Sequence, residues 1–233
     1  MCNTAHNTRP VATRAQWKKL VRHLELVIER NKTLNLTRIT GWDEAVVLHI
    51  LDSLLLQEAF SKAPAGAFVD IGTGAGFPGI PLAIVTGRKG TLVDSVAKKA
   101  AAVQEFVNEL QMSDQLRVES KRIEVLGNEE RGRYTVVTAR AVAQTATLVE
   151  YAAPLLRKGG HLVVAKARPS DAELAAANKA AETCGLRFVE RSAYELPKSF
   201  GHREVLSFCK VGNPRVRLPR AVGMAQHHPF GVK

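Results

Sequence analysis

The sequence predicts an α/β fold with a mostly parallel sheet that ends in an antiparallel hairpin. From residue 67 onward, short runs rich in β-branched residues alternate with helical segments of about 10–15 residues, a pattern typical of a helix-covered parallel sheet. The last two strand runs follow one another without a helix, and Pro197 and Gly201 lie in their connection, so these strands should pair as a hairpin. An apolar strand also leads directly into a glycine-rich segment, where α/β folds place ligand-binding turns.

The expected elements follow in chain order. An amphipathic helix is expected over 13–32, where apolar residues recur every three to four positions and Thr13 is a candidate cap. A second helix is expected over 43–57, with Asp43 at its positive end. Strands are expected at 67–71, 90–94, 116–119, 134–138, 161–166, 186–193 and 204–210. Helices are expected near 78–86, 97–110, 145–157 and 170–184.

These elements divide the chain into three parts. Residues 1–60 form an N-terminal helical extension, 61–210 the α/β domain and 211–233 a basic C-terminal tail. The tail is rich in Pro and Arg and has little apolar periodicity. It is therefore either an ordered arm over the domain or a segment that is disordered when free.

The net charge of +11 lies mainly at the two ends. Residues 1–42 contain eight Lys/Arg and two Asp/Glu, and residues 211–233 contain four Lys/Arg and no acid, whereas the middle is nearly neutral. Basic ends of this kind usually bind a polyanion, most often nucleic acid, and the alternative is a solubilising tail. The interleaved aromatic residues of a single-strand stacking platform are absent.

Three widely spaced cysteines, Cys2, Cys184 and Cys209, give neither a disulfide framework nor a zinc pattern. No run of about 18 apolar residues and no apolar signal core is present, so we expect a cytoplasmic, reduced protein that does not enter a membrane. The pair His227 and His228 lacks further ligands, so no metal site is expected.

The glycine-rich loop is the most informative motif. Gly72, Gly74 and Gly76 alternate after a strand that ends near Asp70, and glycine lets the backbone turn sharply and approach a ligand closely. The nicotinamide fingerprint is G-x-G-x-x-G, whereas this spacing is G-x-G-x-G and looks like the S-adenosylmethionine (AdoMet) loop of class I methyltransferases. Seven strands ending in a hairpin also match that sheet better than a six-stranded dinucleotide fold. The predicted fold is therefore a class I, Rossmann-like, AdoMet-dependent methyltransferase.

Polar residues follow several strands at the edge where their carboxyl ends meet. Asp94 comes 18 residues after Gly76, close to the spacing of a ribose-binding acid, and the loop containing Ile123 and Glu124 would border adenine. Arg140 follows the fourth strand and Lys166 the fifth. Each of these residues also has a purely structural interpretation. Asp70 and Asp94 could cap helices, and residues 121–124 could form a solvated loop. Arg140 could form an ion pair, and Lys166 could lie on the surface. The pair His49 and Asp52 is either a substrate contact or a structural pair.

The candidate site contains no evident acid–base pair. After the fourth strand the sequence lacks the Asn/Asp-Pro-Pro-Tyr/Phe of adenine amino methyltransferases, and no cysteine nucleophile lies near the cleft ends of strands one to four. Guanine N7 carries an in-plane lone pair, so methylation there requires only alignment and exclusion of water. Arg140 would then position the reactants rather than act as a base. An absent acid–base pair is also compatible with a non-catalytic protein.

From about residue 15 to 231 the chain resembles the bacterial small-subunit ribosomal RNA guanine-N7 methyltransferase family (GidB). The matching stretches are Asn35-Leu36-Thr37, His49-Ile50-Leu51-Asp52-Ser53, Asp70 through Pro81, Leu92-Val93-Asp94-Ser95 with Lys98-Lys99, Ala139-Arg140-Ala141, Pro154-Leu155-Leu156 with Gly159-Gly160, and Pro219-Arg220. The resemblance implies methylation of a guanine in the 530 loop of 16S rRNA. The substrate would be free 16S rRNA, the 30S subunit or an assembly intermediate, and the enzyme is expected to be a monomer.

The resemblance also assigns residues. Together with the glycine loop it gives as AdoMet-binding residues Asp70, Gly72, Gly74, Gly76, Phe77, Asp94, Ile123, Glu124 and Arg140. Residues expected to face RNA are His49, Lys166, Arg203, Arg215, Arg217 and Arg220. Leu48, Ala167 and the ending Met224–Phe230 depart from the family pattern, which bears on details of RNA contact.

The sequence leaves three other interpretations of the function open. They are a class I methyltransferase acting on another RNA base or a protein, a nicotinamide-dependent oxidoreductase, and a non-catalytic RNA-binding protein that retains the cofactor fold.

Overall fold

A computed structural model describes residues 12–140 and 142–232. The first eleven residues of the predicted extension, Ala141 of the predicted motif and Lys233 lie outside the described residues. Seven strands form one sheet, in the order β3-β2-β1-β4-β5-β7-β6. The strands are β1 (Phe68–Ile71), β2 (Gly90–Asp94), β3 (Leu116–Ser120), β4 (Tyr134–Arg140), β5 (Leu156–Lys166), β6 (Leu186–Leu196) and β7 (Gly201–Lys210).

The sheet has the predicted topology. Strands β3, β2, β1, β4 and β5 are parallel, whereas β7 pairs antiparallel with both β5 and β6, which confirms the terminal hairpin. The strand order reverses between β1 and β4, where Asp70 lies beside Thr138. In open α/β sheets, ligands bind outside the carboxyl ends of the strands at such a switch point. Asp70, Asp94, Arg140 and Lys166 are at or near the ends of their strands at this edge.

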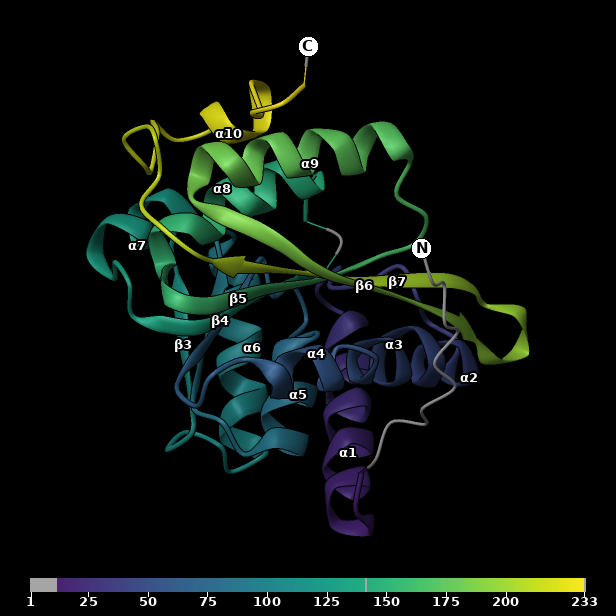
Figure 1. Cartoon of the computed structure of the whole chain (residues 1–233). Helices are drawn as coiled ribbons and strands as arrows, with labels where there is room; N and C mark the ends of the chain where they lie inside the picture. The colour runs from purple at the N-terminus through teal and green to yellow at the C-terminus, as the bar shows by residue number, and fades with distance from the viewer. Residues whose placement is uncertain (1–11, 141, 233) are drawn as a thin grey trace.

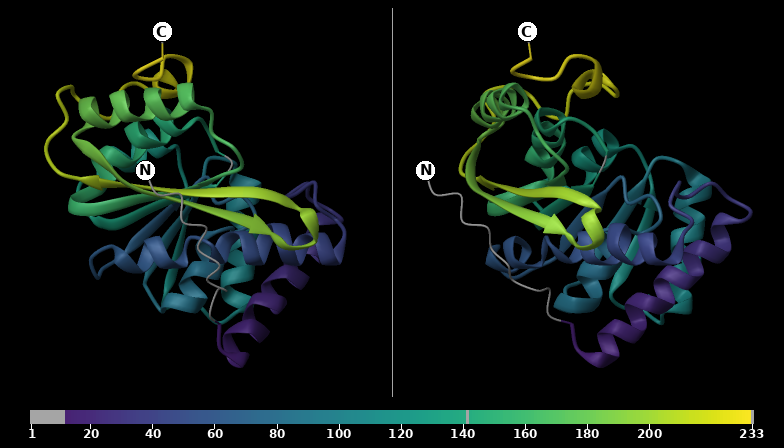
Figure 2. Two further views of the ribbon diagram at one scale, coloured as in Figure 1. Left: turned by 45° about the vertical axis from the view of Figure 1, so that its right-hand side comes forward. Right: turned by 90° about the vertical axis from the view of Figure 1, so that its right-hand side faces the viewer.

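Helices cover both faces of the sheet (Figures 1 and 2). The principal helices are α1 (Arg14–Asn31), α4 (Gln57–Lys62), α5 (Gly79–Thr86), α6 (Ala97–Glu109), α7 (Ile123–Glu129), α8 (Thr145–Leu155) and α9 (Asp171–Cys184). One buried apolar cluster joins the sheet to α1, α4, α5 and α6, and the other joins it to α7, α8 and α9. The result is a three-layer sandwich whose two cores share the strands.

The N-terminal helix packs against the α/β domain. Thr13 and Gln16 form a capping box at the start of α1, and the Gln16 side chain also donates to the carbonyls of Ile84 and Val85 at the end of α5. The apolar stripe of α1 includes Leu24, which is fully buried in the first core cluster. The extension proposed for residues 1–60 therefore shares its core with the domain that follows it.

The expected helix at 43–57 is divided in the structure. A short α2 (Trp42–Ala45) runs into a π-helical segment, η1 (Val46–Leu51), and then into α3 (Asp52–Leu54). A π-helical turn holds one residue more than the α-helical spacing, and apolar periodicity over so few residues does not reveal it. Helices α4 and α7 were also not expected, because their segments are short and rich in charged residues. The expected helix 145–157 ends at Leu155, and β5 begins at Leu156 rather than at 161.

The C-terminal tail is ordered over α8 and α9 and contains the short helix α10 (Met224–His227) (Figure 1). Leu218 and Ala225 are buried, and the guanidinium of Arg220 forms a two-pronged ion pair with the carboxylate of Glu150 in α8. Of the two alternatives for the tail, the structure shows the ordered arm.

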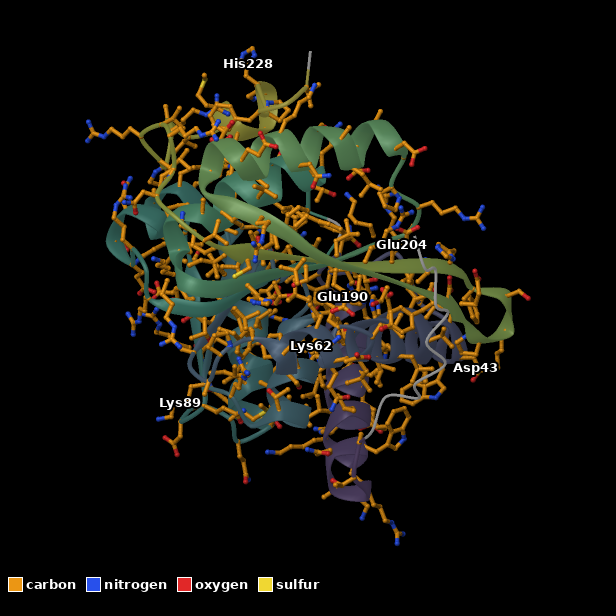
Figure 3. The ribbon with its side chains drawn as sticks, in the orientation of Figure 1. Asp43, Lys62, Lys89, Glu190, Glu204 and His228 are labelled. Carbon is orange, nitrogen blue, oxygen red and sulfur yellow. The ribbon has the colours of Figure 1, made fainter. Side chains whose placement is uncertain are left out.

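Ion pairs join the terminal hairpin to the N-terminal helices. Lys62 of α4 contacts both carboxylate oxygens of Glu190 in β6, at 2.8 and 2.9 Å (Figure 3). Lys198 at the hairpin tip contacts Asp43 of α2 at 2.8 Å. Within the described residues, no helix is long and apolar enough to cross a membrane.

Because α1 contributes to the shared core, Leu24→Ala should lower the free energy of unfolding by about 2–5 kcal/mol. Urea denaturation followed by far-UV circular dichroism measures this change. Glu25→Ala, on the exposed face of the same helix, should change stability by less than about 0.5 kcal/mol. Equal, small effects of the two substitutions would show that α1 is not part of the core.

Candidate functional site

The glycine loop lies directly over the side chain of Asp70. Gly72 and Gly74 have φ values of +68° and +60°, a backbone region that residues with a Cβ rarely adopt. One Asp70 oxygen, Oδ2, accepts hydrogen bonds from Thr73 Oγ1 at 2.7 Å and from the Gly79 amide at 3.0 Å. The other, Oδ1, is buried and has no hydrogen-bond partner among the described residues. Burial raises the pKa of Asp70 to about 7.

A small cavity of roughly 130 Å³ opens beside this loop. Its lining includes Gly72, Asp94, Ile123 and Glu124, which come from the ends of three neighbouring strands. The carboxylate of Asp94 accepts the amides of Gly74 at 3.0 Å and of Val96 at 2.9 Å. Asp94 therefore fixes the glycine loop and the backbone just before α6. The capping alternative is not realised, because the N-cap of α6 is Val96 and no side chain caps this helix.

A larger cavity of roughly 520 Å³ lies at the carboxyl ends of β4 and β5. Residues from the N-terminal helices, from both strands and from β7 line it together. They are Ile39, Leu48, His49, Asp52, Arg140, Ala165, Lys166, Ala167, Arg168, Pro169 and Arg203. Arg140 faces this larger cavity, and Val142 and Ala143, which follow it closely in the chain, face the smaller one. The two cavities thus flank the segment that follows β4.

Asp52 joins the two arginines of the larger cavity. Its Oδ2 lies 3.1 Å from Arg140 Nη1, and its Oδ1 lies 2.9 Å from Arg203 Nε. Arg140 also donates to the carbonyl of Leu48 at 2.7 Å. Burial lowers the pKa of Arg140, and the neighbouring Asp52 carboxylate opposes that shift. Asp52 offsets one of the two arginine charges, so the three side chains together carry one net positive charge. That charge suits an anionic or electron-rich ligand.

The ring of Phe77 is packed between two histidines. His49 stacks on it at 4.6 Å between ring centroids, His23 of α1 lies at 4.4 Å, and the guanidinium of Arg140 is 5.4 Å from its centre. His23 Nε2 bonds the Ala75 carbonyl in the glycine loop at 3.0 Å. Phe77, predicted as a cofactor residue, is buried against these rings and lines neither cavity.

Both histidines are neutral at physiological pH. Burial lowers the pKa of His23 and of His49 to about 3, and the nearby Arg140 charge adds to the effect. Arg140 Nη2 lies 3.2 Å from His49 Nδ1, and because a guanidinium only donates, Nδ1 must accept. The Nε2–H of His49 then donates to Thr37 Oγ1 at 3.0 Å. With its lone pair occupied, His49 is poorly placed to accept a proton from a substrate.

The structure brings most predicted site residues together. Among the residues predicted to face RNA, His49, Lys166 and Arg203 line the larger cavity, while Arg215 and Arg217 are exposed on the tail. Lys166 is 2.8 Å from Glu173 of α9 and also bonds the Ala143 carbonyl, so it forms a structural contact within the site. Arg220 pairs with Glu150 and lines neither cavity.

Sequence reasoning missed several contributors. The double role of Asp52 depends on two strands more than 80 residues away, and only its spacing from His49 gave a signal. His23 looked like part of an amphipathic helix and carried no signal for contact with the glycine loop. Gln226 of the tail lines the smaller cavity, although the tail had been assigned to RNA.

The residues present suit a cofactor with a nucleoside and a charged amino-acid part. The glycine loop offers a close approach, because a Cβ built on Gly74 would meet no atom within 4 Å. The buried Oδ1 of Asp70 is an unsatisfied acceptor next to the loop, although Asp70 itself lines neither cavity. No group of three His, Cys, Asp or Glu side chains that would hold a metal ion is found in the described ranges.

Comparison with known sequences gives one consistent result. The sequence model of the family described as rRNA small subunit methyltransferase G (GidB) matches residues 16–197. A relative from Carboxydothermus hydrogenoformans, "Ribosomal RNA small subunit methyltransferase G", is 39% identical over 90% of this chain and 89% of its own. A protein with the same name from Roseiflexus castenholzii is 41% identical over 86% of each chain.

Solved structures share the fold at low sequence identity. A geranyl diphosphate methyltransferase in complex with GPP and sinefungin aligns with a TM-score of 0.56, 13% identity, and coverage of 85% of this chain and 100% of its own. The [4+2]-cyclase SpnF aligns with a TM-score of 0.58, also at 13% identity, covering 89% of this chain and 100% of its own. Because a cyclase is among them, these likenesses identify a Rossmann-like methyltransferase fold and not a reaction.

The buried histidines should make the protein sensitive to acid. The pKa of His23 is about 3 when folded and 6.5 ordinarily, so between these values the unfolded chain binds one more proton and acidification favours unfolding. Asp70 acts in the opposite direction, because its pKa is raised to about 7 and the folded chain binds the extra proton as pH falls. With two histidines against one aspartate, stability should fall from pH 6 to pH 5.

His23→Gln retains a donor for the Ala75 carbonyl and removes one titrating group. It should reduce the loss of unfolding free energy between pH 6 and pH 5 by about 1.2 kcal/mol. Urea denaturation of both proteins at the two pH values measures this difference. An unchanged pH dependence would mean that His23 is protonated in the folded protein.

Proposed function

The chain belongs to the rRNA small subunit methyltransferase G family, and on that premise we propose that it transfers a methyl group from AdoMet to N7 of a guanine in the 530 loop of 16S rRNA. The acceptor would be free 16S rRNA, a 30S subunit or an assembly intermediate, bound by a monomer. The observation that carries the proposal is the larger cavity, which is positively charged and lacks a free base beside the glycine loop.

The cofactor assignment rests on the loop and the smaller cavity. AdoMet supplies a methyl group bonded to a positively charged sulfur. Gly72 and Gly74 would give it a close backbone approach, Asp94 would lie at the ribose, and Ile123 and Glu124 would border the adenine. Asp70 would accept a hydrogen bond through its unpartnered oxygen, directly or through the loop.

The choice of acceptor rests on proton chemistry. Guanine N7 uses its own lone pair, so no residue has to remove a proton before the methyl group is accepted. The side chains at the larger cavity match this requirement, because His49 is neutral with its lone pair occupied and Asp52 is bound by two arginines. Their task is to orient the base and exclude water, an effect that contributes much of the rate in such reactions.

The RNA would approach over the larger cavity. Arg140, Arg168 and Arg203 lie there on three different segments, and arginine binds phosphate or a guanine edge through a forked pair of donors. A guanine in an RNA loop is readily splayed out of its stack, and an enzyme that acts on a base needs it in that state. Arg215 and Arg217 on the exposed tail are further candidates for phosphate contact.

Gly74→Val should abolish AdoMet binding, because valine at a φ of +60° strains the loop and places methyl groups where the ligand would lie. Isothermal titration calorimetry with AdoMet measures the effect. Gly87→Val is the matched control, because Gly87 has a similar φ of +69° and open space but ends α5 outside both cavities. Unchanged binding by the Gly74 variant would contradict the loop assignment.

The reaction itself is tested with methyl-labelled AdoMet and 30S subunits or 16S rRNA that lack 7-methylguanosine. After digestion of the RNA, label should appear in 7-methylguanosine that maps to the 530 loop. Label in another nucleoside would retain the methyltransferase and overturn the acceptor. Absence of label in RNA, with AdoMet binding shown separately, would favour a protein acceptor or a non-catalytic role.

Arg140→Ala should slow methyl transfer by at least about a hundredfold, because the residue orients the reactants and contacts Phe77 and His49. Arg187→Ala, an exposed arginine of β6 outside both cavities, should leave the rate within about twofold. Circular dichroism checks that both variants fold. Near-normal turnover of the Arg140 variant would remove its proposed role.

A further inference from the structure

The tail is fixed to the domain close to the smaller cavity. Arg220 Nε and Nη2 contact the two carboxylate oxygens of Glu150 at 2.7 and 2.6 Å, and Glu150 is almost fully buried. The Arg220 guanidinium also lies 4.1 Å from the centre of the Phe230 ring and donates to the His228 carbonyl at 2.8 Å. These contacts close the segment between Arg220 and Phe230 into a loop that includes α10.

This loop contacts the domain at two points, and the first of them, Glu124, lies on the wall of the cavity. The Gly223 amide donates to Glu124 Oε1 at 2.9 Å, and Thr147 of α8 donates to the Ala225 carbonyl at 3.1 Å. Tyr151 of α8 lines the same cavity, and burial together with the neighbouring Glu124 charge raises the pKa of its hydroxyl to about 12. The carboxylate of Glu124 is therefore held by the tail rather than left free at the cavity.

Gln226 completes the lining of the same cavity. Its side chain is exposed, and the side-chain amide group makes no hydrogen bond within the part of the chain that the structure describes. Ile123 and Val142 line the cavity as apolar side chains suited to the faces of a flat ring. An amide can donate and accept at once, which matches the paired acceptor and donor at N1 and N6 of adenine.

We propose that the C-terminal segment 220–230 is part of the cofactor site and that Gln226 is a specificity residue that contacts the edge of adenine. The inference rests on the proposed function, because it takes the smaller cavity as the adenosine end of the AdoMet site. It assigns the tail a role in cofactor recognition that is separate from RNA contact. Glu150 and Arg220 are positioning residues in this arrangement, because they act through the loop that carries Gln226.

Binding of S-adenosylhomocysteine, the demethylated form of AdoMet, tests the proposal without RNA or turnover. By isothermal titration calorimetry, Gln226→Ala should weaken binding about three- to tenfold, the range expected for one hydrogen bond at a cavity rim. Met224→Ala is the matched control, because Met224 is exposed in the same helix and does not line the cavity. Its affinity should equal that of the wild type.

A second ligand tests the contact with adenine itself. The purine riboside analogue of S-adenosylhomocysteine lacks the N6 amino group, so the wild type should bind it several-fold more weakly. Gln226→Ala should bind the two ligands with more nearly equal affinity. An unchanged preference, or equal affinity of the wild type and Gln226→Ala for S-adenosylhomocysteine, would overturn the inference. Failure of the wild-type protein to bind either ligand would instead overturn the proposed function.

Discussion

The packing of Phe77 is the contact on which the site depends. Its ring lies between His23 of α1 and His49 of η1, with the Arg140 guanidinium nearby, so one side chain joins the N-terminal helices, the glycine loop and β4. Contacts between aromatic rings stabilise the fold beyond the contribution that comes from burying the rings. His23, whose ring is tilted against Phe77, also bonds the Ala75 carbonyl within the loop. The N-terminal extension therefore supports the glycine loop and is not a separate appendage.

The charges around this packing are arranged to avoid an unpaired buried ion. Arg140 is largely shielded, with 13% of its side chain exposed, and a charge withdrawn from water is tolerated best when it is paired and hydrogen-bonded. Asp52 and the Leu48 carbonyl meet that need, while His49 stays neutral and accepts from the guanidinium. The cavity keeps a positive character from Arg203 and Arg168 without offering a strong base. That combination favours an acceptor that already has a lone pair.

The sequence was sufficient for the parts of the fold that follow from local patterns. Alternating strand and helix runs, the glycine spacing and the absence of a helix between the last two strand runs predicted the sheet and its hairpin. The clustering of Asp94, Glu124, Arg140 and Lys166 followed from their positions at strand ends. The long-range contacts could not be predicted from the sequence. They are the hydrogen bond of His23 to Ala75, the ion pair of Asp52 with Arg203, and the hydrogen bond of the tail to Glu124. None of these contacts leaves a periodic signal, since the partners lie about 50 to 150 residues apart.

The π-helical segment η1 has a consequence for how the chain can vary in length. In this wider turn the Asp52 amide reaches back five residues to the Val47 carbonyl, and the Leu48 carbonyl accepts from Arg140. Deleting one residue between Val46 and Leu51 would restore the regular α-helical spacing and leave the segments on either side nearly in register, because the π-helical turn holds one residue more than an α-helical turn. It would also close the wider turn that carries Leu48 and His49, both of which contact Arg140. The contacts of His49 with Phe77 and Arg140 should then be lost even though Trp42–Ala45 stayed in place. This stretch should accept changes of residue more readily than any change in residue number, even one that makes the helix more regular.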